Sequence, residues 1–157
     1  MKLKYPRPVS SSFGRWITLK NEITILPFSG RFVGYDINTD DLVLANGPNI
    51  YEVIGWIDMP NDVRVYQMED EFLSNTSPDF TYKPGDDVFL ITSVNTRFLI
   101  GVEDMTNVNV GQSYSLTIDS NGNQVLADYS ILPKYVVVEK IYPEAKLVIV
   151  KLLTTHY

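Results

Sequence analysis

The residue types that most restrict this chain are the β-branched and aromatic ones. Val, Ile, Thr, Tyr, Phe and Trp make up 60 of the 157 residues, whereas there are only 3 Ala. These side chains suit the pleated, half-buried surface of a sheet, and they lose rotamer freedom in a helix. Gly, Pro and Asn interrupt the apolar runs at short intervals, as turn residues do. The composition therefore predicts an all-β fold.

The short apolar runs between these turn residues are expected to be strands. Alternation is clearest near the end of the chain, where Val148, Val150 and Leu152 share an apolar face. The Asn121-Gly122 pair predicts a hairpin turn, and Pro143 and the segment 83–86 predict two more. We expect strands at residues 15–19, 22–26, 31–36, 42–45, 51–58, 63–67, 87–92, 97–102, 113–118, 124–127, 135–142 and 146–152.

A domain boundary is expected near the middle of the chain. Residues 74–83 have the composition of a linker, and the short acidic stretch before them, 68–74, is a loop or a single turn rather than a stable helix. The expected parts are an extended basic arm over residues 1–21, a small β domain over 22–74 and a second β domain over 82–157. One continuous sandwich is the alternative, and the residues alone leave this choice open.

The formal charge of −6 is distributed unevenly. Residues 1–21 contain no acidic side chain, and all 19 Asp and Glu lie in the remainder. The alternating prolines Pro6 and Pro8 favour an extended path with few internal hydrogen bonds. Such an arm either stays loose, as many termini do, or docks across an acidic protein surface. For docking, the candidate contact residues are Lys2, Lys4, Tyr5, Arg7, Arg15 and Trp16, although Trp16 fits a core position equally well.

The chain lacks residues that several catalytic chemistries need. It has no Cys, which excludes disulfides, thiol nucleophiles, iron–sulfur clusters and thiolate zinc sites. The one histidine, His156, follows the last expected strand, where an imidazole is normally solvated rather than held in a Ser-His-Asp triad. Glycine-rich phosphate loops and the Gly-x-Ser-x-Gly pattern are missing. These observations predict a protein that is not an enzyme and has no cofactor.

Two segments begin like a calcium-binding loop, at Asp36 and at Asp119. An EF-hand loop needs Gly at its sixth position and Glu at its twelfth. In the first segment these positions are Asp41 and Gly47, and in the second the twelfth is Ser130. Hairpin turns are therefore expected at both places, and no metal site is predicted.

Two binding or catalytic arrangements stay open because they leave no sequence signature. A pair of carboxylates for glycoside hydrolysis is positioned by the fold alone. Aromatic side chains at strand spacing are mostly core, but some of the 19 aromatic residues can form a platform for stacking sugars. A carbohydrate-binding or receptor-binding β-sandwich module is thus the alternative function.

Membrane and nucleic-acid partners are not expected. No run approaches the roughly 20 apolar residues that span a bilayer, and the first residues lack the apolar segment of a secretory signal. A chain that is acidic overall is a poor partner for phosphates. The absence of Cys fits assembly in a cytosol.

From Tyr82 to Leu153, about half of the chain, the layout resembles the small β-barrel or β-tulip domain of tailed-bacteriophage capsid decoration (cement) proteins. The features that carry the resemblance are short turns and strands in a fixed order. They are Lys83-Pro84-Gly85-Asp86 before Val88-Phe89-Leu90, then Phe98-Leu99-Ile100-Gly101-Val102, Val110-Gly111, the Asn121-Gly122 hairpin, and a closing hairpin of residues 136–139 and 147–152.

The resemblance implies a structural protein of the virion, assembled in the host cytoplasm and bound to the capsid surface. Its partner would be the major capsid protein, and it would act as a homotrimer whose extended N-terminal arm laces neighbouring subunits together. Trimerisation raises the effective concentration of later contacts once the first has formed. The N-terminal half does not match the family's pattern well.

Overall fold

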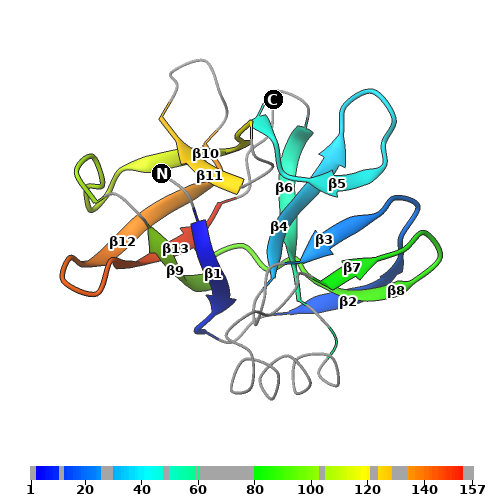
Figure 1. Ribbon diagram of the computed structural model, residues 1–157, viewed down its shortest axis with the longest axis horizontal. Helices are drawn as coiled ribbons and strands as arrows, with labels where there is room; N and C mark the ends of the chain where they lie inside the picture. The colour runs from blue at the N-terminus through cyan, green and yellow to red at the C-terminus, as the bar shows by residue number, and fades with distance from the viewer. Residues whose placement is uncertain are drawn as a thin grey trace.

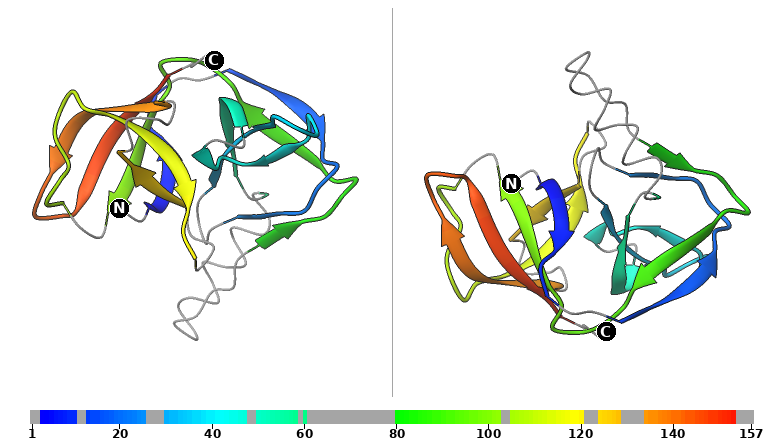
Figure 2. Two further views of the ribbon diagram at one scale, coloured as in Figure 1. Left: turned by 90° about the horizontal axis from the view of Figure 1, so that it is seen from above. Right: turned by 90° about the horizontal axis from the view of Figure 1, so that it is seen from below.

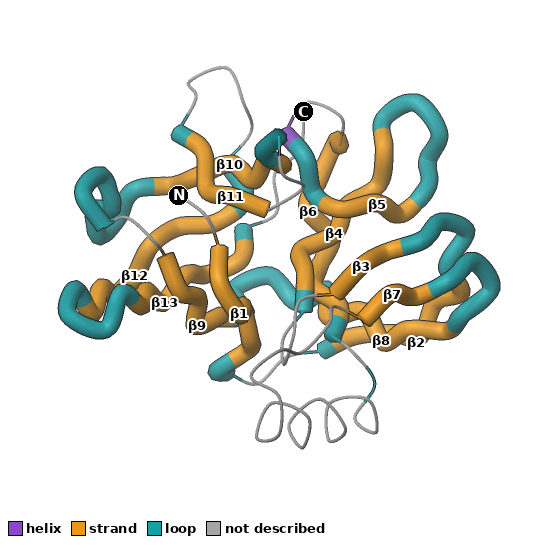
Figure 3. The backbone as a smooth tube through the Cα atoms, in the orientation of Figure 1, coloured by secondary structure: helices purple, strands orange, loops and turns teal. Residues whose placement is uncertain are grey.

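The structure is a computed structural model that describes residues 3–10, 13–25, 30–47, 50–58, 60, 80–102, 105–120, 124–128 and 134–153. The described residues contain thirteen strands and no α-helix, which confirms the all-β prediction. Figure 3 shows these strands, and its one short helical segment is a 3₁₀ turn at Gly47. The strands are β1 (Leu3–Pro8), β2 (Gly14–Thr18), β3 (Ile23–Ile25), β4 (Arg31–Asp36), β5 (Leu42–Leu44), β6 (Ile50–Ile57), β7 (Phe80–Tyr82), β8 (Asp87–Ile91), β9 (Arg97–Val102), β10 (Ser113–Ile118), β11 (Gln124–Ala127), β12 (Val136–Tyr142) and β13 (Leu147–Leu152).

The expected strands that fall on described residues agree with the structure to within one residue at either end. Two strands were not expected. The prolines of residues 3–8 predict an extended arm, but these residues form β1, and β7 has only three residues. The expected strand at 63–67 and the acidic segment 68–74 lie outside the described residues.

The predicted turns connect paired strands. β12 and β13 pair antiparallel on either side of Pro143, and β10 and β11 pair antiparallel around the Asn121-Gly122 pair, which itself lies outside the described residues. Between β7 and β8, Gly85 has a φ of 95°. That left-handed conformation is accessible to glycine at little cost, which lets the chain reverse there.

β1, β9, β13, β12, β10 and β11 form a six-stranded sheet in that order (Figure 1). The sheet curls into a half-barrel, so that its two outer strands, β1 and β11, approach each other (Figure 2). The expectation of a small barrel-like β fold is therefore confirmed. The curled sheet consists of β9 to β13 together with β1, whereas β8, which falls within the expected domain of residues 82–157, lies in another sheet.

A second sheet contains β2, β8, β6, β4 and β5 in that order, and β3 and β7 form a two-stranded sheet beside it (Figure 1). Sheet membership does not follow the expected boundary near residues 74–83. β1 joins the C-terminal strands, whereas β7 and β8 pair with β3 and β2 of the N-terminal part. Each sheet is thus built from residues of both halves of the chain.

The larger apolar core lies inside the half-barrel and continues onto the five-stranded sheet. Phe98 of β9 contacts Phe32 of β4 and Trp56 of β6, with ring centroids 5.1 Å and 5.8 Å apart. All three side chains are buried. A separate core cluster, which includes Ile25, lies between the other face of the five-stranded sheet and the β3–β7 pair. The central strands β4 and β6 of the five-stranded sheet are therefore covered by apolar side chains on both faces.

The buried side chain of Gln124 connects the two large sheets by hydrogen bonds. Its Oε1 accepts from the Phe32 N–H at 3.1 Å, and its Nε2 donates to the carbonyls of Phe32 and Ala45 at 2.8 Å and 3.2 Å. A carboxamide has an N–H donor and a C=O acceptor, like a peptide group. The Gln124 side chain therefore continues the backbone hydrogen bonding along the edge of β4, beyond the point where β5 ends. A buried backbone group that loses such a partner lowers the free energy of unfolding.

We predict that Gln124→Leu lowers the free energy of unfolding by about 2–4 kcal/mol, because it removes the hydrogen-bond partner of the buried Phe32 N–H and of the Ala45 carbonyl. The Phe32 carbonyl keeps its bond from the Ala45 N–H. Urea denaturation followed by circular dichroism measures the loss. Gln112→Leu is the matched control, since Gln112 makes its side-chain hydrogen bonds at the surface. An equal loss in both variants would contradict the role of Gln124.

A network of charges lies on the outer face of the half-barrel. The Arg97 Nε donates to Glu139 Oε2 at 2.7 Å, and the Lys151 Nζ lies 3.7 Å from Glu139 Oε1. The hydrogen bond from Arg97 and the positive charges of Arg97 and Lys151 lower the pKa of Glu139 below its usual value. These contacts tie β9, β12 and β13 together across the sheet.

Because the folded-state pKa of Glu139 is lowered, its charged form contributes stability above the unfolded-state pKa, near 4.5, and loses it as the pH falls through the folded-state pKa. We therefore predict that Glu139→Gln is less stable than wild type at pH 7 and that this difference shrinks by pH 3. Urea midpoints at the two pH values measure it. Glu144→Gln, in the exposed turn after β12, controls for the loss of one negative charge. A difference that stays constant with pH would refute the network's contribution.

Candidate binding surface

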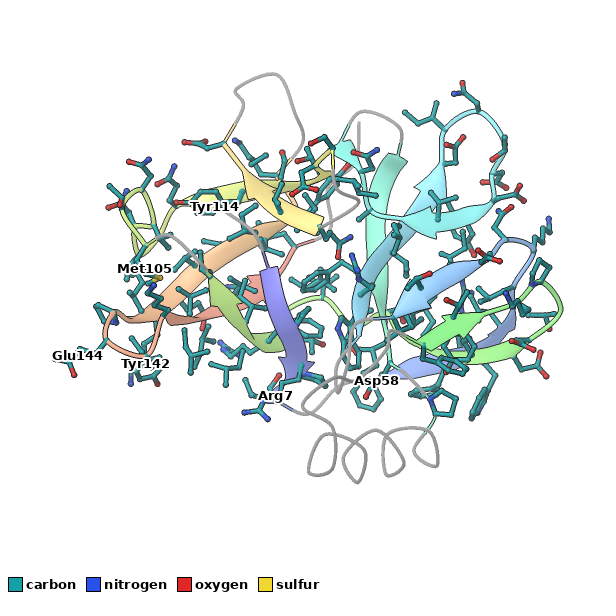
Figure 4. The ribbon with its side chains drawn as sticks, in the orientation of Figure 1. Arg7, Asp58, Met105, Tyr114, Tyr142 and Glu144 are labelled. Carbon is teal, nitrogen blue, oxygen red and sulfur yellow. The ribbon has the colours of Figure 1, made fainter. Side chains whose placement is uncertain are left out.

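The structure separates the six residues predicted for protein contacts. Lys2 lies outside the described residues, and Lys4 and Tyr5 lie on β1. Arg7 is exposed near the end of β1 (Figure 4). Arg15 and Trp16 are both exposed on β2, in the other sheet.

The described part of the expected arm does not extend away from the body of its own chain. β1 pairs antiparallel with β9, and the Val9 N–H donates to the Arg97 carbonyl at 2.8 Å. The buried Pro6 also accepts from the Gly30 N–H, beside the other sheet, at 3.3 Å. Prolines are tolerated here because β1 is an outer strand. Residues 3–8 therefore connect the six-stranded sheet to the five-stranded sheet by hydrogen bonds.

Trp16 and Phe89 form an exposed aromatic pair. They lie directly opposite each other on β2 and β8, their ring centroids are 5.5 Å apart, and the ring planes are tilted by 59°. The Trp16 side chain is 71% exposed and Phe89 is 43% exposed. Large rings that lie in water at such a fraction are typical of a surface that binds a partner.

Gly14 makes room for this pair. A Cβ at that position would lie 2.9 Å from the Phe89 ring and 2.3 Å from the Leu90 carbonyl oxygen. Any side chain would therefore collide with the Phe89 ring and with the backbone of β8. The small residue before Trp16 is thus part of what places the two rings together.

A cavity of about 610 Å³ lies beside the aromatic pair, within the range of small-molecule and peptide pockets. Directly opposite residues of neighbouring strands project from the same face, so one face of β2, β8 and β6 supplies most of the lining. The described lining residues carry two carboxylates, Asp58 and Asp87, and no basic side chain. They are Pro8, Trp16, Trp56, Asp58, Pro60, Tyr82, Asp87, Phe89 and Ile91.

The two carboxylates lie at different distances from the sheet edge formed by β2. Asp87 lies near the sheet edge, because its Oδ1 accepts a 2.6 Å hydrogen bond from the Thr18 hydroxyl on β2. Asp58 follows β6, farther from the edge, on the side of the molecule where β1 ends (Figure 4). Its carbonyl accepts from the Tyr82 hydroxyl at 2.8 Å, which fixes one wall of the cavity.

The edge of β2 presents free hydrogen-bonding groups. In the described residues β2 is an outer strand and pairs with β8 alone. The Phe13 carbonyl accepts from the Thr92 N–H, and the Leu19 N–H donates to the Asp86 carbonyl. Backbone groups alternate in direction along an antiparallel strand, so those of Gly14, Trp16 and Thr18 point away from β8. An outer strand of this kind is a template for strand addition.

Phe89, Asp58 and Asp87 were not among the predicted site residues. The alternation of Asp87, Phe89 and Ile91 shows that they share a face, but the pairing of β8 with a strand some 70 residues earlier has no signal in the sequence. Only that register brings Phe89 beside Trp16.

Other sites considered from the sequence have simpler structural roles. Asp36 closes the β4–β5 hairpin, as expected, and the N–H groups of Asn38 and Thr39 that bond to its carboxylate lower its pKa. Within the described ranges, no group of three or more His, Cys, Asp or Glu is placed to hold a metal ion. The same part of the chain has no helix long and apolar enough to cross a membrane.

We predict that Gly14→Ala lowers the free energy of unfolding by about 1–3 kcal/mol, because the new Cβ forces the Phe89 ring and the β8 backbone to move. Urea denaturation followed by circular dichroism gives the loss. Arg15→Ala, an exposed change at the next residue, should stay within about 0.5 kcal/mol of wild type. If Gly14→Ala unfolds like wild type, the close approach is not required.

Comparison with known proteins found no similar protein. No protein-family model matches the chain, and neither the curated proteins nor the solved structures contain a match.

Proposed function

We propose that this chain is a non-enzymatic structural protein that binds other proteins, as a decoration protein on the surface of a bacteriophage capsid. The observation that carries the proposal is the exposed Trp16–Phe89 pair, in which Trp16 lies on the outer strand β2 and Phe89 on its neighbour β8. The barrel-like sheet of the C-terminal half agrees with the fold that the resemblance implies. The partner in this proposal is the major capsid protein.

An exposed aromatic pair supports binding for an energetic reason. Buried Trp residues at the centre of protein interfaces commonly contribute about 2 kcal/mol or more to affinity. The two rings contact each other across the strands, but their solvent-exposed surfaces add nothing to the stability of the free protein. A partner that covers those surfaces best explains their exposure. A homotrimer would present three of these surfaces together, and the second and third contacts would form at high effective concentration.

The structure limits how the N-terminus could lace neighbouring subunits. β1 already occupies an outer position of its own sheet, and Pro6 bonds to Gly30. Lacing by residues 1–8, with Lys2, Lys4 and Arg7, therefore requires that β1 exchanges between copies. Contact through the surface around Trp16 requires no such exchange.

A carbohydrate-binding module is the second candidate, because aromatic rings and carboxylates lie together at the cavity. Sugars stack on flat rings and donate hydroxyl hydrogen bonds to carboxylates. The 59° tilt between Trp16 and Phe89 argues against it, since the two rings do not form one flat platform. Protein binding is therefore the function that this geometry supports best.

We predict that Trp16→Ala weakens binding to undecorated capsids about 30-fold, the effect of removing an interface Trp that contributes about 2 kcal/mol. Co-sedimentation of the purified protein with capsids measures it. The control is Tyr142→Ala, because Tyr142 is also exposed but lies at the far tip of the β12–β13 hairpin (Figure 4). Its affinity should be unchanged.

Light scattering of the free protein tests the trimer separately. Equal affinity of wild type and Trp16→Ala would contradict the role of this surface. A wild-type chain that does not bind capsids would refute the proposed function, and binding on a glycan array would then favour the carbohydrate module.

A further inference from the structure

The surface around Trp16 has features that indicate how a partner binds, and this inference rests on the proposed function. The outward N–H and C=O groups of Gly14, Trp16 and Thr18 can pair with an extended segment in the same way that β8 pairs on the other side. Such pairing supplies affinity from the backbone. Specificity then comes from the alternate side chains that project over the face of the sheet.

That face is suited to two kinds of side chain. An apolar side chain of the added segment, placed opposite Trp16, would cover the Trp16 and Phe89 rings. Two residues farther along, the next side chain on the same face would lie opposite Thr18. The Thr18 hydroxyl holds the Asp87 carboxylate toward this edge at 2.6 Å. A Lys or Arg at that position is long enough to reach the carboxylate.

The charge of the cavity favours a cation. Asp87 brings a carboxylate to its wall, the described lining residues include no basic side chain, and Trp16 offers an aromatic ring to an ammonium or guanidinium group. Arg15 does not neutralise this face, because it alternates with Trp16 to the opposite side of the sheet, where it donates to the Tyr35 hydroxyl. A segment that carries a positive charge is therefore complementary to the surface.

We propose that β2 receives an extended basic segment of the partner protein as an added strand, with an apolar side chain on the Trp16–Phe89 pair and a Lys or Arg beside Asp87. A second copy of β2 does not meet this requirement. On the face in question it would bring Gly14, Trp16 and Thr18, none of which is cationic. Basic residues of the capsid protein are the expected source.

The probe is a synthetic peptide, acetyl-Ser-Val-Thr-Lys-Thr-Val-Ser amide, in which Val and Lys alternate on one face. It is titrated into the full-length protein, and Trp fluorescence is recorded. We expect saturable binding that weakens with added salt. A matched peptide with Glu in place of Lys should bind about tenfold or more weakly, because it places a like charge beside Asp87. A third peptide, N-methylated at alternate residues, should not bind, because it cannot pair with the edge.

Two variants test the residues involved. Asp87→Asn keeps an acceptor for Thr18 but removes the charge, and it should reduce the preference for the Lys peptide over the Glu peptide by about tenfold. Trp16→Ala should weaken binding of the Lys peptide. Isothermal titration calorimetry measures the affinity of this variant, which lacks the fluorescent Trp16, and its circular dichroism spectrum checks that it is folded. Equal affinity for the Lys and Glu peptides, or binding of the N-methylated peptide, would overturn the inference.

The capsid experiment separates the two proposals. If the protein binds capsids through Trp16 but binds none of the peptides, the strand-addition inference fails and the proposed function stands. If the Lys peptide binds as expected but the protein does not bind capsids, the strand-addition inference is supported and the capsid is not the partner. Concentration-dependent self-association that Trp16→Ala abolishes would show that a second copy is the occupant, contrary to the inference.

Discussion

The arrangement of the two large sheets depends on a buried amide. Gln124 of β11 bonds to the backbone of Phe32 and Ala45, and so completes a hydrogen-bond ladder that β5 leaves unfinished. Apolar contacts between Phe98, Phe32 and Trp56 hold the same sheets together but do not require one orientation. The amide does, because its donor and acceptor match backbone groups at fixed positions. Polar groups in an apolar core commonly select one packing in this way.

The candidate binding surface follows from this arrangement. Once the half-barrel is fixed against the five-stranded sheet, Pro8 at the end of β1 lines the same cavity as Trp16 of β2 and Phe89 of β8. β2 is left as an outer strand, with the Trp16–Phe89 pair on one face and free backbone groups along its edge. In the proposed function, affinity comes from the burial of this surface by the partner.

Local features of this fold could be predicted from the chain itself. The strand at 147–152 alternates so clearly that its buried face was predicted correctly, and the turns at Gly85 and Pro143 follow from backbone chemistry. β1 could not be found in this way. Its prolines and basic residues are typical of an exposed arm, and only the open edge of β9 makes it a strand. Trp16 was proposed for contacts, but its partner Phe89 was not, because the two are brought together by a register between distant segments.

The sequence by itself determined the strand content, most turns and the absence of cysteine chemistry, because these depend on residue type and on neighbours a few positions away. Only the tertiary structure decided which strands share a sheet. That pairing makes residues 3–8 a strand of the six-stranded sheet, and it brings four residues to one cavity: Trp16, Phe89, Asp58 and Asp87. The physical reason is that pairing between distant strands is chosen by burial and by buried hydrogen bonds such as those of Gln124. These burial and hydrogen-bond energies arise only when distant segments of the chain are packed together in the folded state.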